Sequence, residues 1–121
     1  MRVLIADDRS RSRWGLRALL ATLPEMEIVG DARDGREALA LVEALRPDAV
    51  VMDARMPTMD GLAATQIIKE RWPGVRVIVL TMYGSLRAAA GAAGADAFLV
   101  KGCPPDELLD AIVTSAEHRD T

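Results

Sequence analysis

Short apolar runs alternate with longer segments of helical periodicity along the whole chain. Each run is too short for a helix but suits a strand that is buried on both faces. The runs lie at residues 3–6, 49–52, 75–80 and 98–100, and residues 27–32 form a weaker strand candidate that also contains charged residues. Because strands that alternate with helices form right-handed βαβ units, the pattern predicts an α/β fold. We expect a doubly wound parallel sheet of five strands with helices on both faces, and the weaker strand at 27–32 at a sheet edge.

The segments that separate the runs are predicted to be helices because their apolar residues recur at intervals of three and four. The first helix is expected to extend to Pro24. Asp34 followed by Glu37 predicts a capping box for the second helix, and Asp60 predicts a cap for the third. The segment 84–95 is rich in alanine and glycine. Its helix should be short, since an internal glycine costs about 1 kcal/mol relative to alanine.

Composition excludes several classes of function. The 121 residues fit a single domain spanning 1–121, whose polar tail at 117–121 is expected to fray. With 15 basic and 18 acidic residues, the net charge of −3 argues against a nucleic-acid-binding surface. No apolar run approaches the roughly 20 residues that span a bilayer, and no signal peptide is recognisable. The single cysteine, Cys103, cannot form an internal disulfide. A cytoplasmic protein that binds neither nucleic acid nor membrane is therefore expected.

Polar side chains follow four of the predicted strands, at the point where each strand ends. They are Asp7 and Asp8 after the first strand, Asp53 after the third, Thr81 after the fourth and Lys101 after the fifth. The carboxyl ends of parallel strands meet at one edge of the sheet, where open α/β sheets bind their ligands. Any one of these residues could be a simple helix cap. Together they predict a functional site at that edge.

The chemistry of this set fits the acceptance of a phosphoryl group. Neighbouring carboxylates repel one another unless a cation joins them, and oxygen ligands favour a hard ion such as Mg²⁺. Asp53 is the expected nucleophile. Phosphoryl transfer needs mainly positioning and stabilisation of charge. Lys101 is expected to offset the charge of the phosphoryl oxygens, and Thr81 to donate a hydrogen bond to one of them.

These motifs resemble the receiver domain of two-component response regulators over nearly the whole chain. The matching stretches are Asp7-Asp8, the loop from Asp53 through Met56-Pro57 to Asp60-Gly61, Val79-Leu80-Thr81 and Phe98-Leu99-Val100-Lys101. The segments 14–20 and 105–109 are most similar to those of the branch whose receivers precede a LuxR/NarL-type helix-turn-helix. The resemblance implies a flavodoxin-like (CheY-like) fold with strand order 2-1-3-4-5. It also implies a DNA-binding effector domain outside residues 1–121.

The same resemblance implies roles for individual residues. Asp53 is phosphorylated by a sensor histidine kinase, and Phe98 and Thr81 form a conformational switch. The implied Mg²⁺ site consists of Asp8, Asp53 and the main-chain carbonyl of Arg55, with Asp7 close by. The Arg55 side chain is expected to be a solvated loop charge, with an ion pair to an acid in the absence of metal as the alternative. The isomer of the Lys101–Gly102 peptide bond is left open.

The leading hypothesis is a signalling switch of a phosphorelay, and not a metabolic enzyme. Its output is expected to be transcription through its own effector domain, or contact with a downstream protein by a stand-alone regulator. Homodimers through the first and last helices, or through the fourth-helix face, are expected alternatives. An aspartyl-phosphate phosphatase is disfavoured because Asp7 and Asp8 are adjacent, without the spacing of a D-x-D motif. A flavodoxin-like cofactor binder is disfavoured because these acids repel phosphate.

Overall fold

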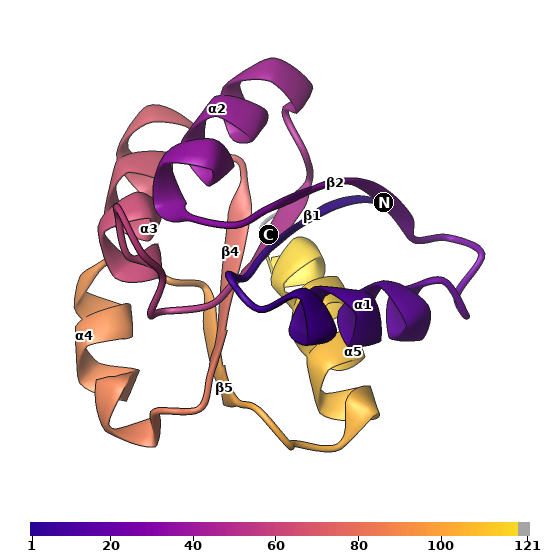
Figure 1. Ribbon diagram of the computed structural model, residues 1–121. Coiled ribbons are helices and arrows are strands. Elements are labelled where there is room, and N and C mark those ends of the chain that lie inside the picture. The colour runs from indigo at the N-terminus through magenta and orange to yellow at the C-terminus, as the bar shows by residue number, and fades with distance from the viewer. Residues whose placement is uncertain (119–121) are drawn as a thin grey trace.

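The computed structural model describes residues 1–118, with side chains described as far as Val113. One parallel sheet runs through the molecule (Figure 1), and its strands are ordered β2-β1-β3-β4-β5. The strands are β1 (Arg2–Ala6), β2 (Glu27–Ala32), β3 (Ala49–Met52), β4 (Arg76–Thr81) and β5 (Ala97–Val100). The predicted doubly wound sheet, its order and the edge position of β2 are therefore confirmed.

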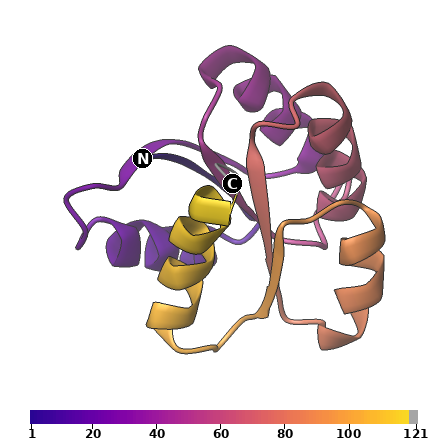
Figure 2. The ribbon, with the colours of Figure 1, turned by 180° about the vertical axis from the view of Figure 1, so that it is seen from behind.

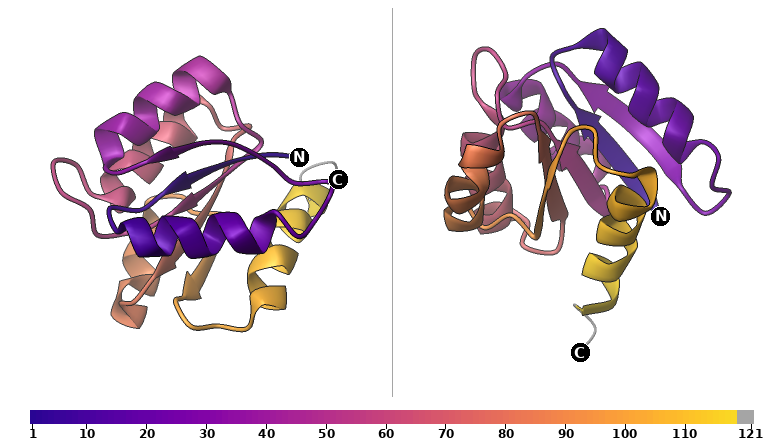
Figure 3. Two further views of the ribbon diagram at one scale, coloured as in Figure 1. Left: turned by 45° about the vertical axis from the view of Figure 1, so that its right-hand side comes forward. Right: turned by 90° about the horizontal axis from the view of Figure 1, so that it is seen from below.

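Helices cover both faces of the sheet. They are α1 (Ser10–Leu20), α2 (Gly35–Leu45), α3 (Gly61–Arg71), the 3-10 turn η1 (Gly84–Leu86), α4 (Arg87–Ala92) and α5 (Pro105–His118). Helices α1 and α5 lie on one face and α2, α3 and α4 on the other, as Figures 2 and 3 show. Over the described residues, the helices all fall short of the length and apolarity that crossing a bilayer requires.

The core consists of two apolar layers, one on each side of the sheet. Val50 and Val51 are neighbours on β3, and they point into opposite layers because strand side chains alternate between faces. Val50 packs with Ile68 of α3, whereas Val51 packs with Leu20 of α1 and Ile112 of α5. Burying each of these side chains contributes roughly 1.5–3 kcal/mol. The sheet is thus held rigidly beneath the loops at its carboxyl edge.

Helix α1 ends earlier than its apolar spacing predicted. Its last residue is Leu20, and Leu23 lies beyond the helix although it packs against the same core layer. Hydrogen bonds to the residue three positions back continue past this end, with the Thr22 N–H donating to the Leu19 carbonyl at 3.2 Å. The Thr22 hydroxyl donates to the same carbonyl at 2.7 Å. These bonds tighten the chain into turns before Pro24 is reached.

The other helix boundaries largely follow the predicted caps. The Asp34 carboxylate accepts the Glu37 N–H at 2.8 Å, and the Asp60 carboxylate accepts the Ala63 N–H at 2.9 Å. The Glu37 carboxylate, however, accepts the N–H of Arg33 at 3.0 Å, one residue before the N–H that a capping box uses. The prediction of the second hydrogen bond of the capping box is therefore wrong by one residue, because its donor is Arg33 and not Asp34.

The chain between β4 and α5 also follows expectation. Helix α4 has 6 residues, which confirms a short helix in the alanine- and glycine-rich segment. The Lys101–Gly102 bond, whose isomer the sequence left open, is trans, as are the other peptide bonds over the described residues, and Gly102 has φ 96°. The last helix begins at Pro105. Of the tail expected to fray, residues 117–118 belong to α5, and 119–121 lie outside the described part.

Gly61 allows the loop after β3 to pass close to the start of α3. A Cβ atom at this position would lie 1.8 Å from the Asp53 carbonyl oxygen. Gly61→Ala is therefore expected to force the loop apart and to lower the free energy of unfolding by about 3 kcal/mol, measured by urea denaturation. Gly15→Ala is the matched control, because a Cβ there meets nothing within 4 Å. It should stabilise α1 by about 0.5–1 kcal/mol, and equal losses in both variants would contradict the steric explanation.

Candidate functional site

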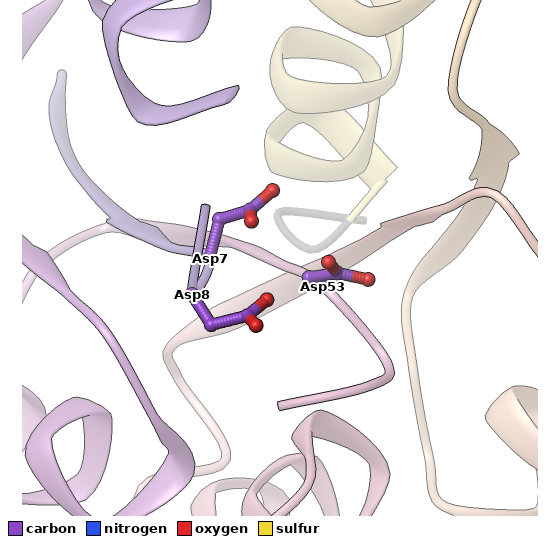
Figure 4. A group of neighbouring side chains, drawn as sticks. All are labelled: Asp7, Asp8 and Asp53. Atoms are coloured by element: carbon purple, nitrogen blue, oxygen red, sulfur yellow. The ribbon is translucent and has the colours of Figure 1, made fainter. Parts of the chain in front are cut away.

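Three carboxylates from two strand ends lie close together at the carboxyl edge of the sheet. Asp7 and Asp8 follow β1, Asp53 follows β3, and Figure 4 shows the three side chains as neighbours. One oxygen from each lies within 4.8 Å of the others. Asp7 is 1% exposed and Asp53 7% exposed, whereas Asp8 is exposed to solvent. The structure therefore brings together the acids that the sequence predicted as a site.

Lys101 reaches into this group from the end of β5. Its Nζ donates to Asp7 Oδ2 at 2.7 Å, to Asp53 Oδ2 at 3.2 Å and to Ser12 Oγ at 3.3 Å. The second Asp7 oxygen, Oδ1, accepts the N–H of Arg9 at 2.9 Å. The lysine ammonium is thus the counter-charge of the two buried carboxylates.

Burial sets the protonation of the central pair. It raises the pKa of Asp53 above its ordinary value; the Asp7 carboxylate adds to this and Lys101 opposes it. Burial alone would lower the pKa of Lys101, but the hydrogen bond to Asp7 and the charge of Asp53 together raise that pKa. Lys101 is therefore fully charged at neutral pH. Burial and the Asp7 carboxylate disfavour the ionised form of Asp53, whereas Lys101 favours it.

Arg13 of α1 binds the main chain of the site. Its Nη1 donates to the main-chain carbonyl of Asp7 at 2.7 Å, and its Nε lies 4.0 Å from Asp31 Oδ2 on β2. Arg17 is also paired with this carboxylate, at 3.5 Å. The turn after β1 is thereby linked through α1 to the edge of the sheet. This link fixes the backbone from which Asp7 and Asp8 project.

A pocket of about 220 Å³ opens beside the carboxylates. It is lined by Asp8, Arg9, Asp53, Arg55, Met82, Tyr83 and Lys101. The Arg55 guanidinium lies 5.4 Å from the centroid of the Tyr83 ring, and Arg9 Nη1 donates to Met82 Sδ at 3.4 Å. Arg55 is exposed, as a solvated loop charge should be, but its contact with Tyr83 was not predicted.

The two predicted switch residues differ in their distance from the acids. Thr81 is fully buried, and its Oγ1 accepts the Tyr83 N–H at 3.3 Å. Its carbonyl accepts the Lys101 N–H at 2.8 Å, which joins the ends of β4 and β5. Phe98 is half-buried on the α4 side of the sheet, with the Arg87 guanidinium 4.8 Å from its ring centroid. Thr81 therefore adjoins the site directly, whereas Phe98 adjoins α4.

Sequence reasoning missed four residues that shape the site. Ser12 and Arg13 lie in α1, and only the packing of that helix shows that they face the acids and Lys101. Arg9 and Tyr83 follow Asp8 and Thr81 by one and two positions. Their closeness to strand ends was a usable signal, because loops at that edge of the sheet carry the ligand contacts.

Comparisons with known proteins agree on one family. A family model described as the response regulator receiver domain matches residues 3–113. The uncharacterized transcriptional regulatory protein YhcZ of Bacillus subtilis is 41% identical over 111 residues, which cover 90% of this chain and 52% of that protein. The chain spans about half the length of the curated relatives that it matches.

Solved structures show the same similarity. A LuxR-family two-component response regulator from Aurantimonas sp. SI85-9A1 superposes with a TM-score of 0.91 at 32% identity, covering 97% of this chain and 85% of that one. The CheX–CheY–BeF3–Mg²⁺ complex from Borrelia burgdorferi gives a TM-score of 0.87 at 28% identity. It covers 94% of this chain and 87% of that one.

Proposed function

The chain belongs to the response regulator receiver domain family, and from that membership we propose that Asp53 accepts a phosphoryl group from a sensor histidine kinase. The observation that carries the proposal is the buried Asp53 carboxylate, open to a pocket and held 3.2 Å from the Lys101 ammonium. A buried nucleophile beside a fixed cation is what phosphoryl transfer requires of a protein.

The reaction uses three side chains of the site, which are Asp53, Lys101 and Thr81. An Asp53 oxygen attacks phosphorus, the bond from phosphorus to the kinase imidazole nitrogen breaks, and the imidazole takes up a proton. Lys101 offsets the charge of the phosphoryl oxygens. The Thr81 hydroxyl already accepts the Tyr83 N–H, so its own hydrogen is available to donate to a phosphoryl oxygen. The transition state is loose, and catalysis is mainly positioning and electrostatic stabilisation.

The acidic group fits a magnesium ion. Opposite ligands of one Mg²⁺ lie about 4.2 Å apart, so the separation of up to 4.8 Å among these oxygens needs only slight contraction or a bridging water. Both Asp7 oxygens already accept hydrogen bonds. Asp8, Asp53 and the Arg55 carbonyl are therefore the proposed ligands, with Asp7 close by. When bound, the ion neutralises charge on the carboxylates and on the phosphoryl group.

The output is proposed from the relatives. YhcZ, a transcriptional regulatory protein by its description, is about twice the length of this chain, so the activated domain is inferred to control its own DNA-binding effector domain. We infer that Thr81 moves toward the phosphoryl group and that Phe98 follows it beneath α4. We propose that the domain acts as a signalling switch in the cytoplasm and not as a metabolic enzyme.

Covalent labelling tests this function directly. The protein is incubated with Mg²⁺ and a small phosphodonor, and its mass is measured. A gain of one phosphoryl group is expected, and fragmentation after borohydride reduction should locate it at Asp53. Asp53→Asn should abolish the gain, because an amide cannot serve as the nucleophile.

The matched control is Asp60→Asn, which makes the same change of acid to amide outside the site. Asp60 caps α3, and asparagine caps a helix about as well as aspartate. This variant should be labelled like the wild type. Labelling of Asp53→Asn at the wild-type rate would overturn the proposed function.

A further inference from the structure

Met82 places an exposed thioether in the wall of the pocket beside Asp53. It directly follows Thr81, which is fully buried, but its own side chain is 55% exposed. Asp53 and Lys101 line the same pocket. Oxidants convert a methionine thioether into a sulfoxide, which is polar where the thioether was apolar. An oxidant that enters from solvent can therefore alter the surroundings of Asp53 at this sulfur.

The other sulfur atoms of the chain are less accessible than that of Met82. The remaining methionines are buried, at most 9% exposed, or half-buried: Met26, Met52 and Met56 are buried, and Met1 and Met59 are half-buried. Cys103 is also half-buried, and burial raises the pKa of its thiol. A protonated thiol is a poor nucleophile. An oxidant in solvent is therefore expected to reach and oxidise Met82 first.

Arg9 is already in contact with the Met82 sulfur. Its Nη1 donates to Met82 Sδ at 3.4 Å, and both side chains line the pocket beside Asp53. A thioether is only a weak hydrogen-bond acceptor. Phosphoryl oxygens are strong acceptors for a guanidinium. When a phosphoryl group enters the pocket, Arg9 can therefore exchange the sulfur for a phosphoryl oxygen.

We propose that Met82 is a site of reversible oxidation, and that its sulfoxide withholds Arg9 from the phosphoryl group at Asp53. The oxidant is a hydroperoxide. The sulfur lone pair attacks the terminal peroxide oxygen, a sulfur–oxygen bond forms and the oxygen–oxygen bond breaks. The proton of the transferred oxygen passes to the leaving oxygen, which departs as water or an alcohol. Sulfur loses two electrons and the peroxide gains them.

The sulfoxide changes the acceptor that Arg9 meets. A sulfoxide oxygen carries partial negative charge and accepts strongly from a guanidinium, whereas the thioether holds it weakly. Arg9 then stays with Met82 and no longer pairs with the incoming phosphoryl oxygens. Phosphorylation of Asp53 should slow by about tenfold, as expected for the loss of one charge-assisted hydrogen bond in the transition state. This consequence rests on the proposed function.

Peptide mass mapping after brief treatment with dilute hydrogen peroxide tests the site itself. Met82 should gain one oxygen several-fold faster than Met59, which is half-buried and packs against the core. A methionine sulfoxide reductase with a thiol reductant should remove the oxygen again. This measurement does not depend on phosphorylation of Asp53.

Labelling kinetics with a small phosphodonor and Mg²⁺ test the consequence. Peroxide-treated wild type should be labelled about tenfold more slowly than the untreated protein, and the reductase should restore the rate. Met82→Leu keeps an apolar side chain of similar size and retains Cys103, so peroxide should leave its labelling rate unchanged. Met59→Leu is the matched control. It should remain as sensitive to peroxide as the wild type.

Two further variants test the part played by Arg9. Arg9→Ala should itself be labelled more slowly, and peroxide should have little further effect, because no guanidinium is left to withhold. Met82→Gln provides a permanent amide oxygen as acceptor and should be labelled about tenfold more slowly than Met82→Leu. Both positions are exposed, so the substitutions leave the core untouched, and unchanged circular dichroism confirms folding.

Each contrary result has a distinct meaning. If the untreated wild type is not labelled, the proposed function fails, and the consequence proposed for Met82 fails with it. If the wild type is labelled but Met82 is oxidised no faster than Met59, or if oxidised Met82 leaves the labelling rate unchanged, only the Met82 proposal is overturned. Slowing of Met82→Leu by peroxide would likewise overturn it, because another residue would then be responsible. Undiminished sensitivity of Arg9→Ala would overturn the role of Arg9.

Discussion

Lys101→Met is expected to slow phosphorylation of Asp53 by about 10²–10³-fold, the loss typical of removing one group that stabilises transition-state charge. It should also destabilise the fold in the absence of divalent cations by about 3 kcal/mol. The reason is that Asp7 and Asp53 are buried, and the lysine is their shared counter-charge. The first effect is measured from labelling kinetics, and the second by urea denaturation in EDTA.

Mg²⁺ should restore much of the stability of Lys101→Met but little of its labelling rate, because the ion compensates the carboxylates without replacing the ammonium at the phosphoryl oxygens. Lys101→Arg keeps the charge and is the control. Since pairing raises the Lys101 pKa, its stabilising contribution is complete at neutral pH. It is lost only as the pH rises above the ordinary lysine value of 10.5. A variant as stable as the wild type in EDTA would contradict the counter-charge role.

Asp53→Asn is expected to stabilise the protein while it abolishes labelling. Burial and the Asp7 carboxylate disfavour the ionised Asp53 side chain in the folded state, and an amide of nearly the same shape removes that cost. The gain should be about 0.5–2 kcal/mol at pH 7 in EDTA, the range of stabilising substitutions at functional sites. Thermal unfolding of both proteins measures it.

The pH dependence of this gain follows from the direction of the pKa shift. Asp53 keeps its proton to higher pH in the folded than in the unfolded state, so wild-type stability falls as the pH rises above the ordinary value of 3.8. The advantage of asparagine should therefore vanish below that pH and be complete above the raised folded pKa. In Mg²⁺ the wild type should become more stable than Asp53→Asn, because the ion binds the wild-type carboxylates more tightly. An unchanged difference between pH 3 and pH 7 would contradict the burial argument.

The fold was predictable because most strands of this sheet contain a continuous apolar run. Ala49–Met52 is buried at all of its positions, and only a strand covered on both faces explains such a segment. The acids and Lys101 were predictable for a related reason, because residues that directly follow parallel strands share one edge. Asp60 was likewise predictable as a cap, since it directly precedes an apolar helical pattern.

Contacts between elements could not be predicted in the same way. Ser12 faces Lys101, and Arg13 holds the Asp7 carbonyl, because α1 packs across the sheet with one particular rotation. The spacing of its leucines limits that rotation without fixing it. Arg55 lies over Tyr83 because two loops from different strands meet above the pocket. Helix α1 ends early because hydrogen bonds of the following turns replace those of the helix. The spacing of apolar residues does not indicate such bonds.

The salt bridges of Lys101 bear on the order of events in the life of the protein. Because the acidic centre contains its own cation, the newly made chain can fold before it encounters a divalent ion. On the proposed function, folding and metal binding are therefore separate steps, and the domain without magnesium is expected to be folded but not phosphorylated.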